Sequence, residues 1–313
     1  MPDLQGEFYE KLGKRNLCLF TMSAMTPKKR SVVINADDLG IHPAVNAGIL
    51  RAYKEGVVTS TSLMSCGEAF EEGIELLNEN PGLGVGVHLT LVEQKPLSDP
   101  DNVGSLVDHT GHMPFDPATF VKGWCSGKIR RQDVLQELNL QIKRAIDAGV
   151  RPSHFDSHQH IHCLPGIWGI VVELARRHKV PFIRVPKFEA VLSGRHGRAA
   201  IFSRASVNIF GAIHRLRWPK EIVKMFPSRG MNSSGSMTPQ SLIQILNDAC
   251  EGITEIMVHP SVKDEDLMSR YDHWRYDWGE DLETVTNEMV IEACKNSEVT
   301  LTNFSKLRDG DTG

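Results

Sequence analysis

The chain of 313 residues is long enough to bury one large core and matches the length of a single α/β barrel with insertions. Its formal net charge of −4 and its scattered Lys and Arg residues provide no basic surface for a phosphate backbone, which argues against a nucleic-acid partner. Six cysteines without a CxxC pair predict reduced thiols rather than a disulfide framework, and no apolar run approaches the ~20 residues that a membrane helix needs.

Residues 1–30 are expected to form a poorly ordered N-terminal extension. Leu17 to Met25 is a short apolar run that follows Lys14 and Arg15, which is the outline of a signal peptide. Acidic residues precede this run, however, and Lys28-Lys29-Arg30 stands where a small-residue cleavage site is expected. We therefore favour an extension of a cytoplasmic protein over a signal peptide.

From residue 31, strand and helix patterns alternate along the chain. The apolar or β-branched segments that predict strands are 31–36, 57–64, 83–89, 152–155, 182–185, 222–226 and 253–259. The segments with a helical period are 43–54, 69–77, 132–148, 167–178, 198–217 and 239–249. This alternation is typical of a parallel sheet, open or closed.

The stretch 92–127 is rich in Pro, Gly, Asp and Ser and interrupts the alternation. Loops of this length are uncommon in compact domains unless they serve a site. We therefore expect a long insertion that covers one face of the domain as a lid.

Two adjacent carboxylates, Asp37 and Asp38, follow the first predicted strand. Their repulsion in a shielded site is costly unless a cation or a proton offsets it, which points to a metal. Because neighbouring side chains diverge, one aspartate can bind the ion while the other reaches a bound water as a general base. The alternative is that both residues simply cap the helix that begins near Pro43.

The segment Asp156-Ser157-His158-Gln159-His160-Ile161-His162 places three histidines at alternate positions after a carboxylate. On an extended backbone the three would share one face, whereas a helix that begins within the run leaves only part of the set in a common site. The strand pattern at 152–155 and the helix that opens after Leu164 favour the second case. The run therefore predicts a metal site at a strand end, where α/β enzymes have their sites.

Two further histidines, His88 and His259, end predicted strands. A lone histidine such as His88 is more often a satisfied core group, but with Asp38 and His158 it completes one carboxylate and two imidazoles, a set suited to Zn²⁺ and similar ions. His259, before Pro260, is either structural or the acid that protonates a leaving group. The combination predicts a hydrolase.

The other polar residues of the histidine run have open roles. Asp156 either orients a metal-bound histidine from behind or caps a turn or helix. His160 and His162 are outer partners of the site, substrate contacts or exposed loop residues. Most of the remaining histidines are expected at the surface: His42, His109, His112, His154, His178, His196, His214 and His273.

Five motifs stand in a fixed order along the chain. They are Asn35-Ala36-Asp37-Asp38-Leu39-Gly40, Val57 to Met64, Gly86-Val87-His88-Leu89, Asp156 to His162, and Met257-Val258-His259-Pro260. In order and spacing they resemble the YdjC family of carbohydrate deacetylases, over residues 31–307. The stretch 91–97 and the later Arg184-Val185-Pro186 look closest to the branch associated with hopanoid biosynthesis. Residues 1–30 depart from the family pattern, and 308–313 are left as a C-terminal tail.

The resemblance implies a NodB-like distorted (β/α) barrel, a single domain with a long loop insertion, that removes acetyl groups from N-acetylated amino sugars such as chitooligosaccharides. It implies one divalent metal ion, Mg²⁺ or Zn²⁺, bound by Asp38, His88 and His158. Water would be activated by the metal and Asp37, and the leaving amine protonated by His259. His158 is chosen over His160 because the family's metal histidine comes first in its Asp-Ser-His run. Substrate contacts, or groups behind the ligands, are expected at Asp156, His160, His162 and Arg184.

The expected partner is a small-molecule or lipid-linked amino-sugar substrate, and a homodimer is left open. Two other classes of function are also open: a metal hydrolase that cleaves a phosphoester or a cyclic amide with the same ligands, and a non-catalytic sugar-binding protein. A binding protein would not need Asp37 beside Asp38, so the metal content of the purified protein separates these classes.

Overall fold

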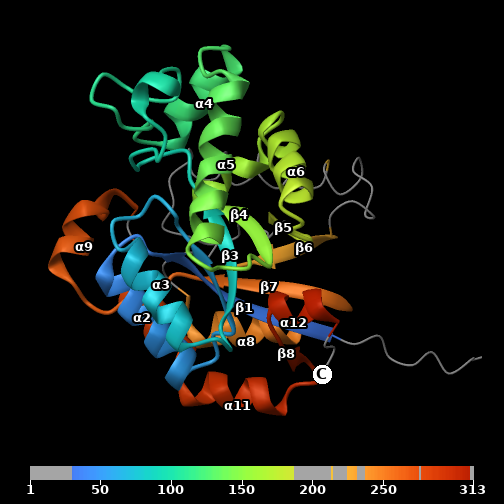
Figure 1. The fold of residues 1–313 in the computed structure, drawn as a ribbon. Coiled ribbons are helices and arrows are strands. Elements are labelled where there is room, and N and C mark those ends of the chain that lie inside the picture. The colour runs from blue at the N-terminus through green and yellow to red at the C-terminus, as the bar shows by residue number, and fades with distance from the viewer. Residues whose placement is uncertain (1–29, 187–212, 214–223, 231–236, 275, 311–313) are drawn as a thin grey trace, which may run out of the picture.

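Seven of the eight described β-strands close into a parallel barrel with helices between them (Figure 1). The computed structural model describes residues 30–186, 213, 224–230, 237–274 and 276–310. The strands follow one another around the barrel from β1 to β7, and β1 pairs with both β2 and β7 to close it. The predicted (β/α) barrel is therefore confirmed.

The strands are β1 (Arg30–Leu39), β2 (Ser60–Leu63), β3 (Gly84–Leu89), β4 (His154–Ser157), β5 (Phe182–Pro186), β6 (Lys224–Arg229), β7 (Gly252–Val258) and β8 (Thr300–Leu301). The α-helices are α2 (Pro43–Glu55), α3 (Phe70–Glu79), α4 (Pro117–Cys125), α5 (Arg131–Asp147), α6 (Ile167–Arg177), α8 (Pro239–Asn247), α9 (Glu265–Arg270), α10 (Trp278–Val285), α11 (Glu288–Asn296) and α12 (Phe304–Asp309). Three short 3₁₀ helices are η1 (Pro100–Asn102), η2 (His158–Cys163) and η4 (Asp272–Trp274). Each predicted strand has a counterpart, whereas the predicted helix at 198–217 lies outside the described residues except at residue 213. Within those residues, no helix is both long and apolar enough to cross a membrane.

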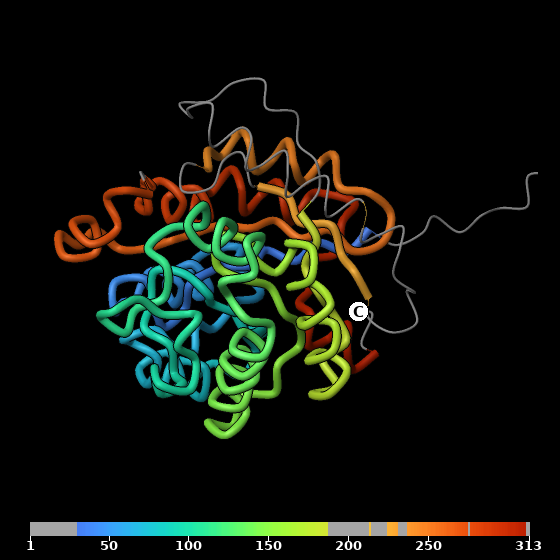
Figure 2. Tube along the Cα trace, turned by 90° about the horizontal axis from the view of Figure 1, so that it is seen from above, coloured from blue at the N-terminus to red at the C-terminus, as the bar shows by residue number. Residues whose placement is uncertain are grey.

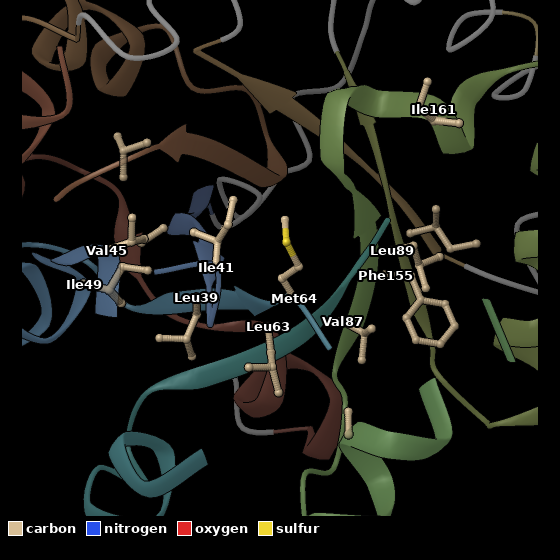
Figure 3. Packing of buried hydrophobic residues seen from close by; sticks show 14 of the residues in the cluster. Leu39, Ile41, Val45, Ile49, Leu63, Met64, Val87, Leu89, Phe155 and Ile161 are labelled. Carbon is tan, nitrogen blue, oxygen red and sulfur yellow. The ribbon is translucent and has the colours of Figure 1, made fainter. Parts of the chain in front are cut away.

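The outer face of the barrel carries a row of apolar side chains that the helices cover. Leu39 pairs in register with Leu63, Leu63 with Val87, and Val87 with Phe155, and Figure 3 shows these four side chains along the row. All four are buried in one hydrophobic cluster. Because strand side chains alternate between faces, the neighbours of Val87 and Phe155 point into the barrel.

The interior is apolar at the amino ends of the strands and polar at their carboxyl ends. The interior plug consists of Val33, Phe182, Phe226 and Phe304, with the rings of Phe226 and Phe304 4.2 Å apart. Two residues further along their strands, Asn35 and Arg184 replace the apolar side chains. Apart from His154, which packs against Phe304, the titratable groups of the barrel interior therefore gather toward its carboxyl end, where barrel enzymes have their sites.

The insertion at 92–127 is tied to α5 by buried side chains. Glu137 accepts hydrogen bonds from the backbone N–H groups of Leu97 (3.0 Å) and Ser98 (2.9 Å). Asp133 accepts from the backbone N–H of Ser105 at 3.1 Å and from its hydroxyl at 2.7 Å. The insertion also contains η1 and α4, so it is more regular than a simple loop. Seen from above, the green segments of α4 and α5 lie on one side of the molecule and the orange segments after β6 on the other (Figure 2).

Candidate active site

Both adjacent aspartates at the end of β1 point into the barrel. On a regular strand their side chains would diverge, but Asp38 has a left-handed backbone with φ of 70° and the pairing of β1 shifts register between Ala36 and Leu39. Asp37 and Asp38 are consequently each 1% exposed and reach the same buried centre. They do not cap α2, because the N-cap there is His42, whose Nδ1 accepts from the Ala44 N–H at 3.1 Å. The left-handed residue thus leaves both carboxylates in the interior with different partners: Asp38 contacts His88 and His158, and Asp37 contacts Arg184.

Asp38, His88 and His158 bring three ligand atoms together. Asp38 Oδ1 lies 3.2 Å from His88 Nε2 and 3.1 Å from His158 Nδ1, and all three residues are buried. A tetrahedral Zn²⁺ with bonds of ~2.0–2.1 Å keeps its ligand atoms about 3.3 Å apart. The donor set and its spacing therefore fit a divalent ion.

Each of the two histidines has a second carboxylate on its other ring nitrogen. His88 Nδ1 lies 2.9 Å from Asp156 Oδ1, and His158 Nε2 lies 3.0 Å from Glu93 Oε2. Burial lowers the pKa of both histidines, but Asp156 and Asp38 outweigh it at His88 and raise its pKa to about 10. Asp38 and Glu93 likewise raise the pKa of His158 to about 9. The site thus favours positive charge, either protons on the imidazoles or a metal cation.

In the described part of the chain, three other clusters of potential metal ligands have a carboxylate that is already paired with an arginine side chain. They are Asp37 with His88 and Asp156, His154 with Asp156 and Glu255, and His42 with Glu68 and Asp266. Arg184 pairs with Asp156 at 2.8 Å, and Arg270 pairs with Glu68 at 2.6 Å and with Asp266 at 2.8 Å. These arginines compensate the charge that a metal ion would otherwise neutralise.

Arg184 is the fully buried counter-ion of three carboxylates. Its Nη atoms donate to the two oxygens of Asp37 at 2.5 and 2.7 Å, and it pairs with Glu255 through two contacts of 2.8 Å and with Asp156 at 2.8 Å. One guanidinium cannot neutralise three carboxylates, and burial raises the pKa of Glu255 to about 7. Arg184 was expected either to contact the substrate or to lie behind the reactive groups. Because it is fully buried among the three carboxylates, it lies behind them.

His259 lies beside Asp37. Its Nε2 is 3.9 Å from Asp37 Oδ2, and its Nδ1 is 4.0 Å from Asp281 Oδ2. The Asp281 carboxylate also accepts from the backbone N–H groups of His259 and Met237, both at 2.7 Å. Burial raises the pKa of Asp281 to about 6. Asp281 thus fixes the end of β7 and orients His259 toward Asp37.

The histidine run divides at the start of η2. His158 alone joins the ligand set, because the extended backbone of β4 ends at Ser157 and the next residues, Gln159 and His160, are left-handed with φ of 54°. His162 bridges two elements, with Nδ1 2.6 Å from Ser157 Oγ and Nε2 2.9 Å from the carbonyl oxygen of Arg184. His160 contributes nothing to the ligand set, and its Nδ1 is buried without a partner within the described residues.

Two histidines expected at the surface are buried. His42 is 5% exposed at the N-cap of α2, and His154 is fully buried against Phe304, with ring centroids 4.5 Å apart. His154 also explains Gly86: a Cβ there would lie 2.4 Å from the imidazole Cε1, so only glycine fits two residues before His88. Both histidines have roles in packing and capping that their sequence neighbours do not reveal.

An aromatic wall, formed by Trp274 and Tyr276, runs from His158 to His259. The Trp274 ring centroid lies 4.8 Å from that of His158, the Tyr276 centroid lies 5.0 Å from that of His259, and the two wall residues are 5.5 Å apart. Both side chains are partly exposed. The wall therefore places partly exposed aromatic rings next to both His158 and His259.

Several residues of the site were missed by the sequence analysis: Glu93, Glu255, Asp281, Trp274 and Tyr276. Glu255 had a visible signal, because a carboxylate in the apolar strand β7 requires a buried partner. Glu93 and Asp281 stand in polar stretches, where nothing local distinguishes them from exposed residues.

The chain matches the family model described as YdjC-like protein over residues 31–296. It is 33% identical over 278 residues to a carbohydrate deacetylase of Clostridium beijerinckii. The aligned region covers 88% of this chain and 99% of that protein. A carbohydrate deacetylase of Brevibacillus brevis is 29% identical over 280 residues, again 88% of this chain and 99% of that protein.

A solved structure from Enterococcus faecalis V583 has the same fold, with a TM-score of 0.71 and 27% sequence identity. The match covers 89% of this chain and 99% of that one. That protein is described as a cellobiose-phosphate cleavage protein.

Proposed function

The chain belongs to the YdjC-like protein family, and from that premise we propose that it is a metal-dependent carbohydrate deacetylase that releases acetate from N-acetylated amino sugars. The observation that carries this proposal is the ligand set of Asp38, His88 and His158 with a second carboxylate, Asp37, beside it. The carbohydrate deacetylases among its relatives support the choice of reaction.

Asp38, His88 and His158 would bind the divalent ion, Mg²⁺ or Zn²⁺. The ion would supply Lewis-acid chemistry, which polarises the amide carbonyl and makes a water molecule more acidic. One carboxylate and two imidazoles leave coordination positions open for water and substrate. The set therefore suits a catalytic rather than a purely structural ion.

Asp37 is the proposed general base. Its carboxylate is fixed by the bidentate pair with Arg184 and by Asn35, whose Nδ2 donates to Oδ1 at 2.7 Å. Held in this orientation, Asp37 takes the proton of the water that attacks the acetamide carbon. Such proton transfer by a positioned side chain contributes ~10²–10⁴-fold to a rate.

His259 is the proposed general acid. Its Nε2 lies 3.9 Å from the proposed base Asp37, with Asp281 near its Nδ1, and from there it would donate a proton to the amide nitrogen as the C–N bond breaks. The acetyl carbon keeps the oxygen of the attacking water, so the products are acetate and a free amine. The partly exposed aromatic wall would pack against the apolar face of the sugar ring.

Acetate release from a panel of substrates tests this proposal. The panel contains N-acetylated monosaccharides, chitooligosaccharides and a lipid-linked N-acetylated sugar, each tried with Zn²⁺ and with Mg²⁺ added to the metal-free protein. We expect acetate and free amine in equal amounts from at least one member, and none when the metal is withheld.

A phosphorylated disaccharide and a cyclic amide belong in the same panel, because the fold neighbour from Enterococcus faecalis carries a proposed phosphosugar activity. Hydrolysis of either compound, with no acetate from any N-acetylated sugar, would overturn the deacetylase assignment while leaving the metal site in place.

A further inference from the structure

We propose that Glu93, a residue of the insertion, is a positioning residue that fixes the metal ligand His158 in its binding orientation. The inference rests on the proposed function, because it requires a metal at Asp38, His88 and His158. It assigns a role in metal binding to a residue that does not belong to the barrel strands.

The contact between Glu93 and His158 is short and shielded from water. Glu93 Oε2 lies 3.0 Å from His158 Nε2, and both side chains are 4% exposed. The other ring nitrogen, Nδ1, lies 3.1 Å from Asp38 Oδ1. The imidazole thus lies between two carboxylates: Asp38, which belongs to the ligand set, and Glu93, which does not.

This arrangement selects one tautomer of the ligand. A neutral imidazole has one N–H group and one lone pair, and the hydrogen bond made by one nitrogen determines which nitrogen is left for a metal. A Glu93 carboxylate can only accept, so it requires the N–H on Nε2 and leaves the lone pair on Nδ1. Nδ1 is the nitrogen that faces Asp38 and the ligand set.

His88 has the same arrangement with its nitrogens exchanged. Its Nδ1 lies 2.9 Å from Asp156, and its Nε2 lies 3.2 Å from Asp38. Asp156 belongs to strand β4 of the barrel, whereas Glu93 belongs to the insertion. One proposed metal ligand is thus oriented by the barrel and the other by the insertion.

The backbone around Glu93 is built to hold this carboxylate in place. Glu93 is left-handed with φ of 67°, a conformation that residues other than glycine adopt only when their surroundings enforce it. Its N–H donates to the carbonyl oxygen of Pro114 at 2.9 Å, and the Met113 N–H donates to that of Gln94 at 3.1 Å. These two bonds join the near and far parts of the insertion at the residue that touches His158.

Glu93 is not itself placed as a ligand. It contacts the ring nitrogen that points away from Asp38, and it is absent from the groups of described residues whose ligand atoms converge. Its other oxygen, Oε1, lies 3.5 Å from His273 Nε2 in the segment next to the aromatic wall. A carboxylate behind a metal-bound histidine typically changes metal affinity ~10–100-fold.

The test measures Zn²⁺ affinity on metal-free full-length protein by competition with a chromophoric chelator. Glu93→Ala removes the acceptor, Glu93→Gln keeps a neutral acceptor, and Asp133→Asn is the matched control. Asp133 anchors the insertion at Ser105 without touching the ligand set. Circular dichroism of each metal-free variant establishes that it is folded.

We expect Glu93→Ala to weaken Zn²⁺ binding ~10–100-fold and Glu93→Gln to recover part of that loss, with Asp133→Asn unchanged. If Glu93→Ala does not fold, the glutamine variant carries the test and is expected to bind several-fold more weakly than the wild type. Equal affinity in wild type and folded Glu93 variants, or an equal loss in Asp133→Asn, would overturn the inference alone. A wild-type protein that binds no divalent ion would instead refute the proposed metal site.

Discussion

Replacing Arg184 by methionine should destabilise the protein severely, and the loss should depend on pH. Met has a similar length and no charge, so Arg184→Met removes the counter-ion with little change in volume. It leaves Asp37, Asp156 and Glu255 in the barrel interior without the guanidinium that contacts all three.

The expected magnitude follows from the burial of these groups. Removing one partner of a buried ion pair costs about 3–5 kcal/mol, because an uncompensated charge remains in a medium of low dielectric constant. Arg184 and its three partners are essentially inaccessible to water, so we expect the upper end of that range, about 5 kcal/mol. This is a third or more of the ~5–15 kcal/mol by which native proteins are stable.

The pH dependence separates this explanation from a packing defect. In the wild type, burial tends to raise the pKa of Asp156, but Arg184 outweighs it and holds that pKa below its usual range, so this stabilisation is lost as pH falls. In Arg184→Met, burial without the guanidinium raises the pKa of the Asp156 and Glu255 carboxyl groups. The folded variant then binds more protons than its unfolded chain at neutral pH, so its deficit grows as pH rises and shrinks as pH falls.

Urea unfolding of wild type and variant at about pH 5 and about pH 8 measures this difference. The control is Glu255→Gln, made alone and with Arg184→Met; it removes one of the stranded carboxylates and should restore part of the stability only in the double variant. A deficit below about 1 kcal/mol, or one that is the same at both pH values, would show that the three carboxylates are not compensated by Arg184.

The remaining predictions concern the metal and the substrate. Asp37→Asn should keep its metal content, measured by elemental analysis, and lose ~10²–10⁴-fold in kcat; full turnover would remove Asp37 from the role of base. His158→Ala should lose the metal whereas the matched His160→Ala keeps it, and the reverse would show that the ligand is His160. Because the pKa values of His88 and His158 are raised to about 10 and about 9, metal must displace protons from both, so affinity should rise with pH up to that range. Calorimetry near neutral pH in buffers of different ionisation enthalpy should detect up to about two protons released per ion, and none would contradict the assigned ligands. Trp274→Ala should raise KM for an N-acetylated sugar more than Trp274→Phe does, and an unchanged KM would mean that the aromatic wall does not contact the sugar.

The sequence predicted the barrel well because buried parallel strands are continuous apolar runs. Strand β3, for example, was expected at 83–89 and occupies Gly84–Leu89. The segments after β7 were not predicted: α9, α10, α11 and α12 are short and rich in charged residues, and β8 has only two residues. Such segments are ordered by packing against the barrel, which local propensity does not report.

The sequence predicted only those residues of the candidate site that stand at the end of a predicted strand. Asp38, His88 and His158 do so, and the barrel brings them together because the carboxyl ends of parallel strands meet at one face. Glu93 and His158 are 65 residues apart, and their contact depends on the path of the insertion, which no local pattern encodes. The left-handed backbone of Asp38 was equally invisible, since aspartate occurs in this conformation and outside it.

The interior plug has a consequence for the order in which the protein can fold. Strand β1 pairs with β7 and β8, and Phe304, which completes the plug, belongs to the last described helix. Contacts between segments so distant along the chain form late and slowly. A nascent chain on the ribosome therefore cannot close the barrel before β7 has been made, and Arg184 lacks Glu255 until then. The interior plug stays incomplete until Phe304 follows. Truncation before α12 should remove Phe304 from the interior plug and make the protein a substrate for proteases or chaperones.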